Sequence, residues 1–251
     1  MIKKILNDIE YWEKLENYEK NIISVFAVKN NLTKYLKNIK NKKNKEIIDF
    51  GCGFGYAIHF IKDFKIIYAV DFSENMLNKA KEINRDYKNV NFIKGNLKTT
   101  FIKKVDVILA VSSVMPKNYN EFDVIIKNFL KNLKENGEII LVLPSFESAT
   151  FFYHLRADYL FKQNKKASEI QEFIKKAQIN ENYMPLGYLI TKINLIQKHW
   201  LREEILFRLS KYNFKDVKIE KLELDWEKQI VNYKHFKNYP KLWFWLVKIK
   251  N

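Results

Sequence analysis

The sequence predicts an α/β fold built on a mostly parallel sheet, and three observations predict it. Between Lys45 and Leu143, short apolar runs alternate with segments whose apolar residues fall at helical spacing, which is typical of parallel strands joined by helices. A glycine-rich loop at residues 51–55 ends the first apolar run. The later runs also end in polar residues, so we expect these ends to meet at the carboxyl edge of one sheet, where ligands bind in such folds.

The first strand and its loop organise the chain. Ile47 to Phe50 is apolar without helical periodicity and predicts a buried strand that carries Asp49. Three glycines in the following five residues, Gly51-Cys52-Gly53-Phe54-Gly55, cannot continue a strand, but they permit positive φ and a close approach of a ligand to the backbone. The segment from Tyr56 to Phe64 is apolar at helical spacing, so the loop should direct a helix N-terminus at its ligand.

Two common phosphate-binding loops fit this stretch poorly. A dinucleotide loop reads G-x-G-x-x-G/A, and here Tyr56 stands where we expect the third glycine. A P-loop requires Gly-Lys-Ser/Thr, which is missing. The remaining pattern, D-x-G-x-G-x-G, resembles motif I of the class I S-adenosylmethionine-dependent methyltransferases.

Further pieces of that resemblance follow in order. A second apolar run ends at Asp71, a position from which a carboxylate can accept both hydroxyls of a ribose. The next residues, Phe72 to Leu77, resemble the family's D-x-S-x-x-M-L, with Ser73 as a helix N-cap. The resemblance implies that Asp71 holds the adenosine ribose and that Met76 flanks the adenine, although a core methionine would have the same spacing.

The third and fourth pieces are the strands that end near Asn96 and Val111, and the fifth is the run from Leu130 to Leu143 with its turn at Asn136-Gly137. The family usually carries Asp where Asn96 stands, and an amide oxygen can still accept from the adenine amino group. The N-terminal Tyr11-Trp12 resembles a helix that folds over the bound cofactor, and packing on the domain is the alternative. The cofactor-binding residues implied by the resemblance are Tyr11, Trp12, Asp49, Gly51, Cys52, Gly53, Gly55, Asp71, Phe72, Met76, Asn96, Leu97 and Val111.

The resemblance also implies the overall fold. We expect a Rossmann-like, seven-stranded, mostly parallel sheet with helices on both faces, an antiparallel last strand between the fifth and sixth, and a helical lid insertion after the fifth strand. One methyltransferase domain would span residues 1–251, with N-terminal helices at 1–44, the cofactor-binding core at 45–143, the lid at 144–200, and the last helix and strand pair at 201–251. The expected helices lie near 22–39, 56–63, 73–84, 120–133, 147–166, 167–177 and 200–211, and the expected later strands at 188–196, 214–224 and 240–247.

Methyl transfer from a sulfonium is an in-line displacement whose leaving group becomes neutral, so the protein mainly supplies alignment and a dry site. A base helps when the acceptor must lose a proton. The candidates are His154 and His199, for which a structural or solvent-facing role is the alternative. Cys52 lies in the cofactor loop and is disfavoured as a nucleophile, and no His/Cys/Asp spacing indicates a metal.

We expect a small-molecule methyl acceptor. The formal charge of +16 invites a nucleic-acid interpretation, but only four of the 45 basic residues are arginines, the better residue for phosphate and base contacts. Val111-Ser112-Ser113-Val114 stands where an adenine-directed enzyme would carry Asp/Asn-Pro-Pro-Tyr. An RNA or protein methyltransferase and a non-catalytic cofactor-binding subunit stay open as alternatives.

A cytoplasmic protein is the expectation for location. No apolar run approaches the ~20 residues that span a bilayer, and the N-terminus lacks the apolar core of a signal peptide. The single cysteine excludes a disulfide within the chain.

Overall fold

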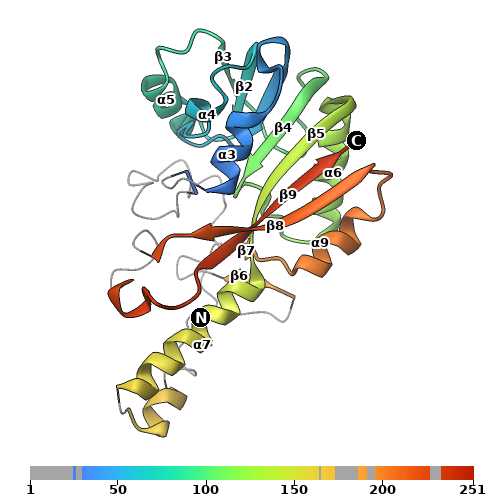
Figure 1. Ribbon diagram of the computed structural model, residues 1–251. Coiled ribbons are helices and arrows are strands. Elements are labelled where there is room, and N and C mark those ends of the chain that lie inside the picture. Colours follow the sequence, from blue (N-terminus) through green and yellow to red (C-terminus); the bar gives the residue numbers. More distant parts are fainter. Residues whose placement is uncertain (1–24, 27–29, 164, 173–185, 191–195, 227–232) are drawn as a thin grey trace, which may run out of the picture.

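Seven strands form one sheet in the order β3-β2-β1-β4-β5-β9-β8 (Figure 1). The computed structural model describes residues 25–26, 30–163, 165–172, 186–190, 196–226 and 233–251. Strands β1 to β5 pair in parallel, and β9 runs antiparallel between β5 and β8. The predicted fold class is therefore confirmed, including its antiparallel last strand. The strands are β1 Glu46–Phe50, β2 Ile66–Asp71, β3 Val90–Lys94, β4 Val105–Val111, β5 Leu133–Pro144, β8 Asp216–Leu224 and β9 Leu242–Lys250.

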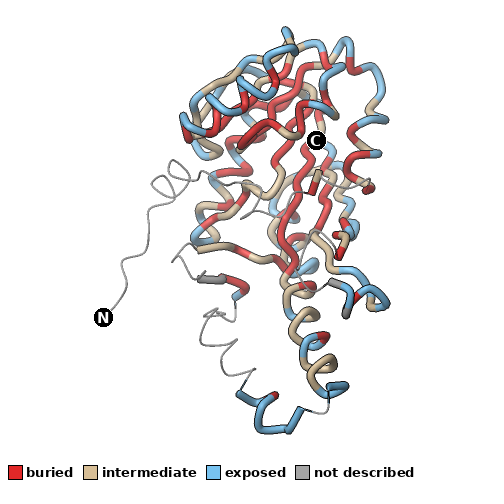
Figure 2. Tube along the Cα trace, turned by 90° about the vertical axis from the view of Figure 1, so that its left-hand side faces the viewer, coloured by how far each residue is buried: buried red, intermediate tan, exposed pale blue. Residues whose placement is uncertain are grey.

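Helices cover both faces of the sheet because the central strands are apolar on both sides. In β5, Ile139 and Leu141 belong to one buried cluster, and Ile140 and Val142 belong to the other. The first cluster lies under α6 (Tyr119–Asn132) and α9 (Arg202–Leu209). The second lies under α3 (Asn31–Asn38), α4 (Ile58–Ile61) and α5 (Glu74–Ile83). Figure 2 shows the sheet as the buried centre of the molecule.

Helix caps place several helix starts at the carboxyl edge of the sheet. Ser73 lies two residues after the end of β2 and accepts a hydrogen bond from the Met76 nitrogen, as the sequence predicted. Ser145 follows β5 and caps the next helix through the Ser148 nitrogen. Side-chain oxygens at these positions satisfy backbone donors that would otherwise lack partners. The helix expected at 56–63 is shorter, since α4 ends at Ile61 and the chain turns to bury Phe64 beneath it.

The insertion after β5 begins with α7 (Phe146–Lys162), which projects beyond the end of the sheet (Figure 1). Residues 167–172 are again helical. A two-stranded hairpin of β6 (Tyr188–Ile190) and β7 (Ile196–Lys198) stands where we expected one strand over 188–196. The helical insertion after the fifth strand is therefore confirmed, and its end is a hairpin because Tyr188 pairs with Lys198.

The insertion returns to the end of β5 before α9 begins. The Trp200 nitrogen donates to the Pro144 oxygen at 2.8 Å, and the Phe146 nitrogen donates to the Trp200 oxygen at 3.0 Å. The strand expected at 240–247 begins at Leu242 and continues to Lys250, and it pairs with β8 along its whole length and with β5 from Phe244 onward. Within the described residues, no helix has the length and apolarity needed to cross a membrane.

Candidate functional site

The glycine loop turns back on the neighbouring strand as soon as β1 ends. The backbone nitrogens of Gly51 and Cys52 both donate to the Val70 oxygen of β2, at 2.7 and 3.0 Å. Gly51, Gly53 and Gly55 have φ values of +73°, +53° and +74°. This is the left-handed region that favours glycine, so the conformational reason for the glycines is confirmed.

Asp71 connects this loop to the start of α5. Its Oδ2 accepts from the Gly53 nitrogen at 2.9 Å, and its Oδ1 accepts from the Ser73 nitrogen at 3.0 Å. The residue is only 6% exposed. Carboxylate oxygens have further lone pairs, so the same group can accept from a ligand while it holds the loop.

Asp49 is a buried acid with an unused acceptor. It is 2% exposed, and its Oδ2 has no hydrogen-bond partner in the described part of the chain. Burial, together with the nearby charge of Asp71, raises the pKa of Asp49 to about 7. An unpaired buried carboxylate oxygen costs free energy, so this crevice suits a ligand that brings hydrogen-bond donors or positive charge. Burial also raises the pKa of the Cys52 thiol, which is the opposite of what a nucleophile requires.

The end of β4 supplies two residues that the predicted site did not include. A Cβ placed on Gly51 would lie 2.3 Å from the Ser113 Cβ, so the loop and this serine are packed too closely for any side chain. The Ser113 hydroxyl donates to the Phe50 oxygen at 2.7 Å. Ser112 has φ +53°, and its buried Oγ has no partner among the described residues. Strained backbone and an unpaired polar atom often mark functional sites. The only sequence signal was a serine pair directly after a strand.

The remaining predicted cofactor residues take varied positions. The Asn96 Oδ1 already accepts from the nitrogens of Lys98 and Thr99, so its amide nitrogen is the group left for a ligand. Met76 is buried in the core. Three further predicted residues are partly buried at strand ends: Phe72, Leu97 and Val111. Tyr11 and Trp12 lie outside the described residues.

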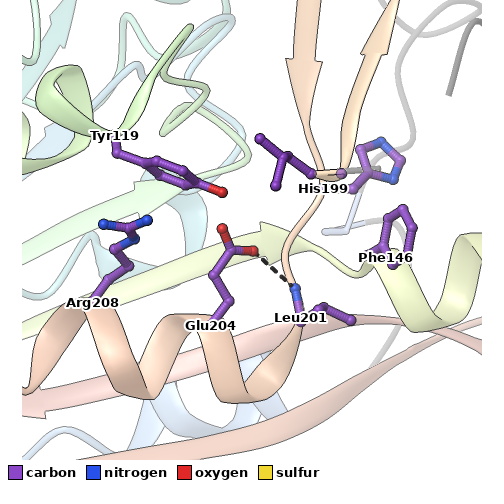
Figure 3. Close-up of a pocket in the computed structure, with 8 residues that line it drawn as sticks. Tyr119, Phe146, His199, Leu201, Glu204 and Arg208 are labelled. Atoms are coloured by element: carbon purple, nitrogen blue, oxygen red, sulfur yellow. Dashed lines mark hydrogen bonds between the residues drawn. The ribbon is translucent and has the colours of Figure 1, made fainter. Parts of the chain in front are cut away.

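A separate pocket of about 210 Å³ opens at the same edge of the sheet (Figure 3). Tyr119 begins α6 after the loop that leaves β4, and Phe146 begins α7 after β5, so both walls start at strand ends. The returning hairpin and α9 close the other sides. The lining residues are Tyr119, Phe146, Leu186, Gly187, His199, Leu201, Glu204 and Arg208.

A buried lysine holds this pocket together. Lys198 is fully buried, and its Nζ donates to the oxygens of Leu186 and His199 and to Glu204 Oε2, each at 2.8 Å. All three ammonium donors are thus used, which offsets the cost of burying the charge. A Cβ on Gly187 would lie 2.4 Å from the His199 oxygen, so the hairpin can close on Lys198 only at a glycine.

The two candidate bases occupy different environments. His199 lines the pocket, and burial together with the charge of Lys198 lowers its pKa to about 4. Its imidazole is therefore neutral near pH 7 and can accept a proton. His154 is exposed on α7 and is not among the residues that line the pocket. Tyr119, Glu204 and Arg208 were missing from the predicted site.

Known proteins resemble this chain in sequence and fold. A model of the methyltransferase domain family matches residues 41–202. An uncharacterized protein of Methanocaldococcus jannaschii is 30% identical over 153 residues, which cover 59% of this chain and 64% of that protein. The shared region thus spans less than two thirds of that relative's length.

Two solved structures show the same fold at low identity. One comes from the complex between the Haloferax volcanii Trm112 methyltransferase activator and a methyltransferase, with a TM-score of 0.64, 10% identity and coverage of 98% of this chain and 99% of the matched chain. The other is the Burkholderia thailandensis 1,6-didemethyltoxoflavin-N1-methyltransferase with bound 1,6-didemethyltoxoflavin and S-adenosylhomocysteine, with a TM-score of 0.58, 9% identity and coverage of 91% and 79%. The family match covers the glycine loop, Asp71 and the pocket walls up to Arg202, so the resemblance to class I S-adenosylmethionine-dependent methyltransferases is confirmed, and the chain belongs to the methyltransferase domain family.

Proposed function

We propose that this protein transfers a methyl group from S-adenosylmethionine to a small-molecule acceptor held in the pocket of Figure 3. That pocket is the observation that carries the proposal. Its volume of about 210 Å³ lies below the roughly 300–1,000 Å³ of pockets for drug-sized ligands. Two of its walls follow β4 and β5, and β4 pairs with β1, which leads into the glycine loop, so an acceptor there would lie at the same edge of the sheet as a bound cofactor.

The crevice beside the glycine loop fits the cofactor in charge and hydrogen bonding. Bound S-adenosylmethionine would supply a methyl group on a positively charged sulfur. Asp71, whose oxygens also accept from the nitrogens of Gly53 and Ser73, would accept the ribose hydroxyls. The unpaired Asp49 oxygen would face the cationic part of the cofactor, which would also favour the charged form of this acid. The Asn96 amide nitrogen could donate to a ring nitrogen of the adenine.

Alignment and water exclusion are the contributions of the chain itself. Phe146, Leu186 and Leu201 give the pocket apolar walls that displace water from an acceptor. His199 is neutral near pH 7 and lines the pocket, so it would be the proton acceptor for an acceptor hydroxyl or amine, and its low pKa makes it a weak base. Some of the exposed lysines, such as Lys94 and Lys98, pair with neighbouring acids, which reduces the positive charge that they would offer to RNA. RNA or protein is the competing class of acceptor.

Two measurements test the proposal. Titration calorimetry should show binding of S-adenosylmethionine and S-adenosylhomocysteine and no binding of NAD; the reverse preference would overturn the cofactor assignment. Labelled cofactor incubated with fractions of a cell extract should then label a small molecule that mass spectrometry identifies. Binding without turnover in any fraction would favour a non-catalytic cofactor-binding subunit, and label in RNA or protein alone would favour a methyltransferase that acts on macromolecules.

A further inference from the structure

The pocket holds one cation that no described acid neutralises. Lys198 and Glu204 form an ion pair at 2.8 Å and cancel each other. His199 is neutral near pH 7 because its pKa is low. Arg208, on the next turn of α9, has no ion pair with any residue that the structure describes, and its buried Nε has no hydrogen-bond partner there. Lys198 contacts three of the lining residues, and when it is counted with Glu204 and Arg208 the pocket carries a net charge of about +1.

The Arg208 guanidinium is held in a fixed position. Its Cζ lies 3.5 Å from the centroid of the Tyr119 ring, so the planar group stacks on the aromatic face. Figure 3 shows Tyr119, Glu204 and Arg208 converging from α6 and α9 on the same space. The Nε donor keeps no partner among the described residues in this position, and a guanidinium presents its N–H groups as a fork that matches two oxygens of one oxyanion. Burial of an unpaired donor is costly, so a ligand that accepts from it gains affinity.

We propose that the acceptor is a small molecule with an apolar body and a single carboxylate, and that Arg208 binds the carboxylate. This inference rests on the proposed function and adds the acceptor's chemical class. The net charge of the pocket favours a monoanion over a dianionic phosphate, because Glu204 would repel the second negative charge. Phe146, Leu186 and Leu201 supply the apolar contacts for the body of the ligand.

The test compares three probes of similar shape on the full chain saturated with S-adenosylhomocysteine: benzoate, benzamide and phenyl phosphate. Ligand-observed NMR titration should give a dissociation constant for benzoate that is lower than that of benzamide by on the order of tenfold or more, as expected for hydrogen bonds to a charged group. Phenyl phosphate should bind more weakly than benzoate. Undetectable benzoate binding, equal affinity for benzamide, or preference for phenyl phosphate would each overturn the inference.

Variants assign the effect to Arg208. Arg208→Gln should abolish the preference for benzoate over benzamide, and Arg208→Lys should restore part of it because the charge returns without the fork. Arg202→Gln is the matched control, since Arg202 lies on the same helix, is exposed and pairs with Glu203. A preference that survives Arg208→Gln, or that Arg202→Gln abolishes equally, would contradict the assignment. Should Arg208→Gln fail to fold, the affinities of the wild-type protein for the three probes still test whether the pocket prefers a carboxylate.

Calorimetry with S-adenosylhomocysteine on the same preparations separates this inference from the proposed function. Arg208→Gln should bind that product as the wild type does. Wild-type protein that binds the product but does not discriminate between the probes would overturn only the acceptor class. Wild-type protein that does not bind the product would overturn the proposed function itself.

Discussion

The Asp71 carboxylate accepts a 2.9 Å hydrogen bond from the backbone nitrogen of Gly53, 18 residues earlier in the chain. Its second oxygen accepts from Ser73, where α5 begins. One acid thus holds the glycine loop in place before any ligand arrives. The sequence predicts a role for this acid in ribose binding, and the structure adds that its carboxylate holds the glycine loop and the start of α5.

Removal of the Asp71 carboxylate should weaken both cofactor binding and folding. Asp71→Ala should cost on the order of 2–4 kcal/mol in affinity for S-adenosylhomocysteine, because two hydrogen bonds to a charged acceptor are lost. It should also lower the free energy of unfolding by about 2 kcal/mol, since Gly53 and Ser73 lose their acceptor. Calorimetry and denaturant titration measure the two effects. Asp86→Ala, at an exposed acid, is the control, and unchanged affinity in Asp71→Ala would remove Asp71 from the site.

Asp49 should make the unliganded protein less stable as the pH rises. The folded state raises the pKa of this acid from 3.8 to about 7, so between these values the folded protein holds a proton that the unfolded chain has released. Stability linked to this group is therefore present below pH 4 and lost as the pH rises to 7, by at most about 4 kcal/mol at about 1.4 kcal/mol per pH unit.

Asp49→Asn isolates that effect, because it removes the charge and keeps the shape. The variant should melt at a higher temperature than the wild type at pH 8 and at a similar temperature at pH 4, while its affinity for the cofactor falls. Thermal denaturation at a series of pH values, without ligand, measures the difference. A wild-type melting temperature that exceeds the variant's at pH 8 would contradict a raised pKa.

Gly51 and Ser113 should show a coupling free energy. Gly51→Ala forces a Cβ to within 2.3 Å of the Ser113 Cβ and places alanine at φ +73°, so it should lower the free energy of unfolding by more than the 1–2 kcal/mol of the backbone strain alone. Ser113→Gly in the same chain should recover the part due to the clash and leave the strain. A double-mutant cycle by denaturant titration measures the coupling. Strictly additive effects would show that the two residues do not press on each other.

Substitutions of the two candidate histidines should affect the rate of methyl transfer differently. His199→Asn should lower the rate of methyl transfer to the identified acceptor by about tenfold or more, because a proton acceptor in the pocket wall is lost. His154→Asn should leave the rate within twofold, since His154 is exposed outside the pocket. The wild-type rate should show no rise near pH 6.5, because His199 has a pKa of about 4. Equal loss in both variants would argue against a role for either side chain in transfer.

Much of the fold and of the cofactor crevice could be predicted because the signals are local. Gly51, Gly53 and Gly55 stand together in the chain, and Asp71 and Ser73 lie two residues apart at the end of an apolar run. The contact of Gly51 with Ser113 depends on the register between β1 and β4, which no local pattern encodes.

The pocket could not be predicted because it, too, depends on contacts between segments that are distant in sequence. Its walls come from α6, the hairpin and α9, which are far apart in sequence. Tyr119, Glu204 and Arg208 are residue types that occur commonly on exposed helices, so their sequence context gives no sign of a pocket. Only the tertiary structure brings them together. Lys198 is one of many lysines, and its burial follows from three acceptors that the folded hairpin and α9 place around it.

The placement of β9 between β5 and β8 has a consequence for synthesis on the ribosome. Strand β8 leaves the ribosome first, yet its only strand neighbour in the described part of the chain is β9, which follows later in the sequence. The five parallel strands can therefore assemble while the chain is still growing, but β5 keeps an open edge and β8 stays undocked until β9 has emerged. An open strand edge is a template for wrong pairing. Truncation between Leu224 and Leu242 should thus produce aggregates, whereas a chain that extends through β9 to Lys250 should not.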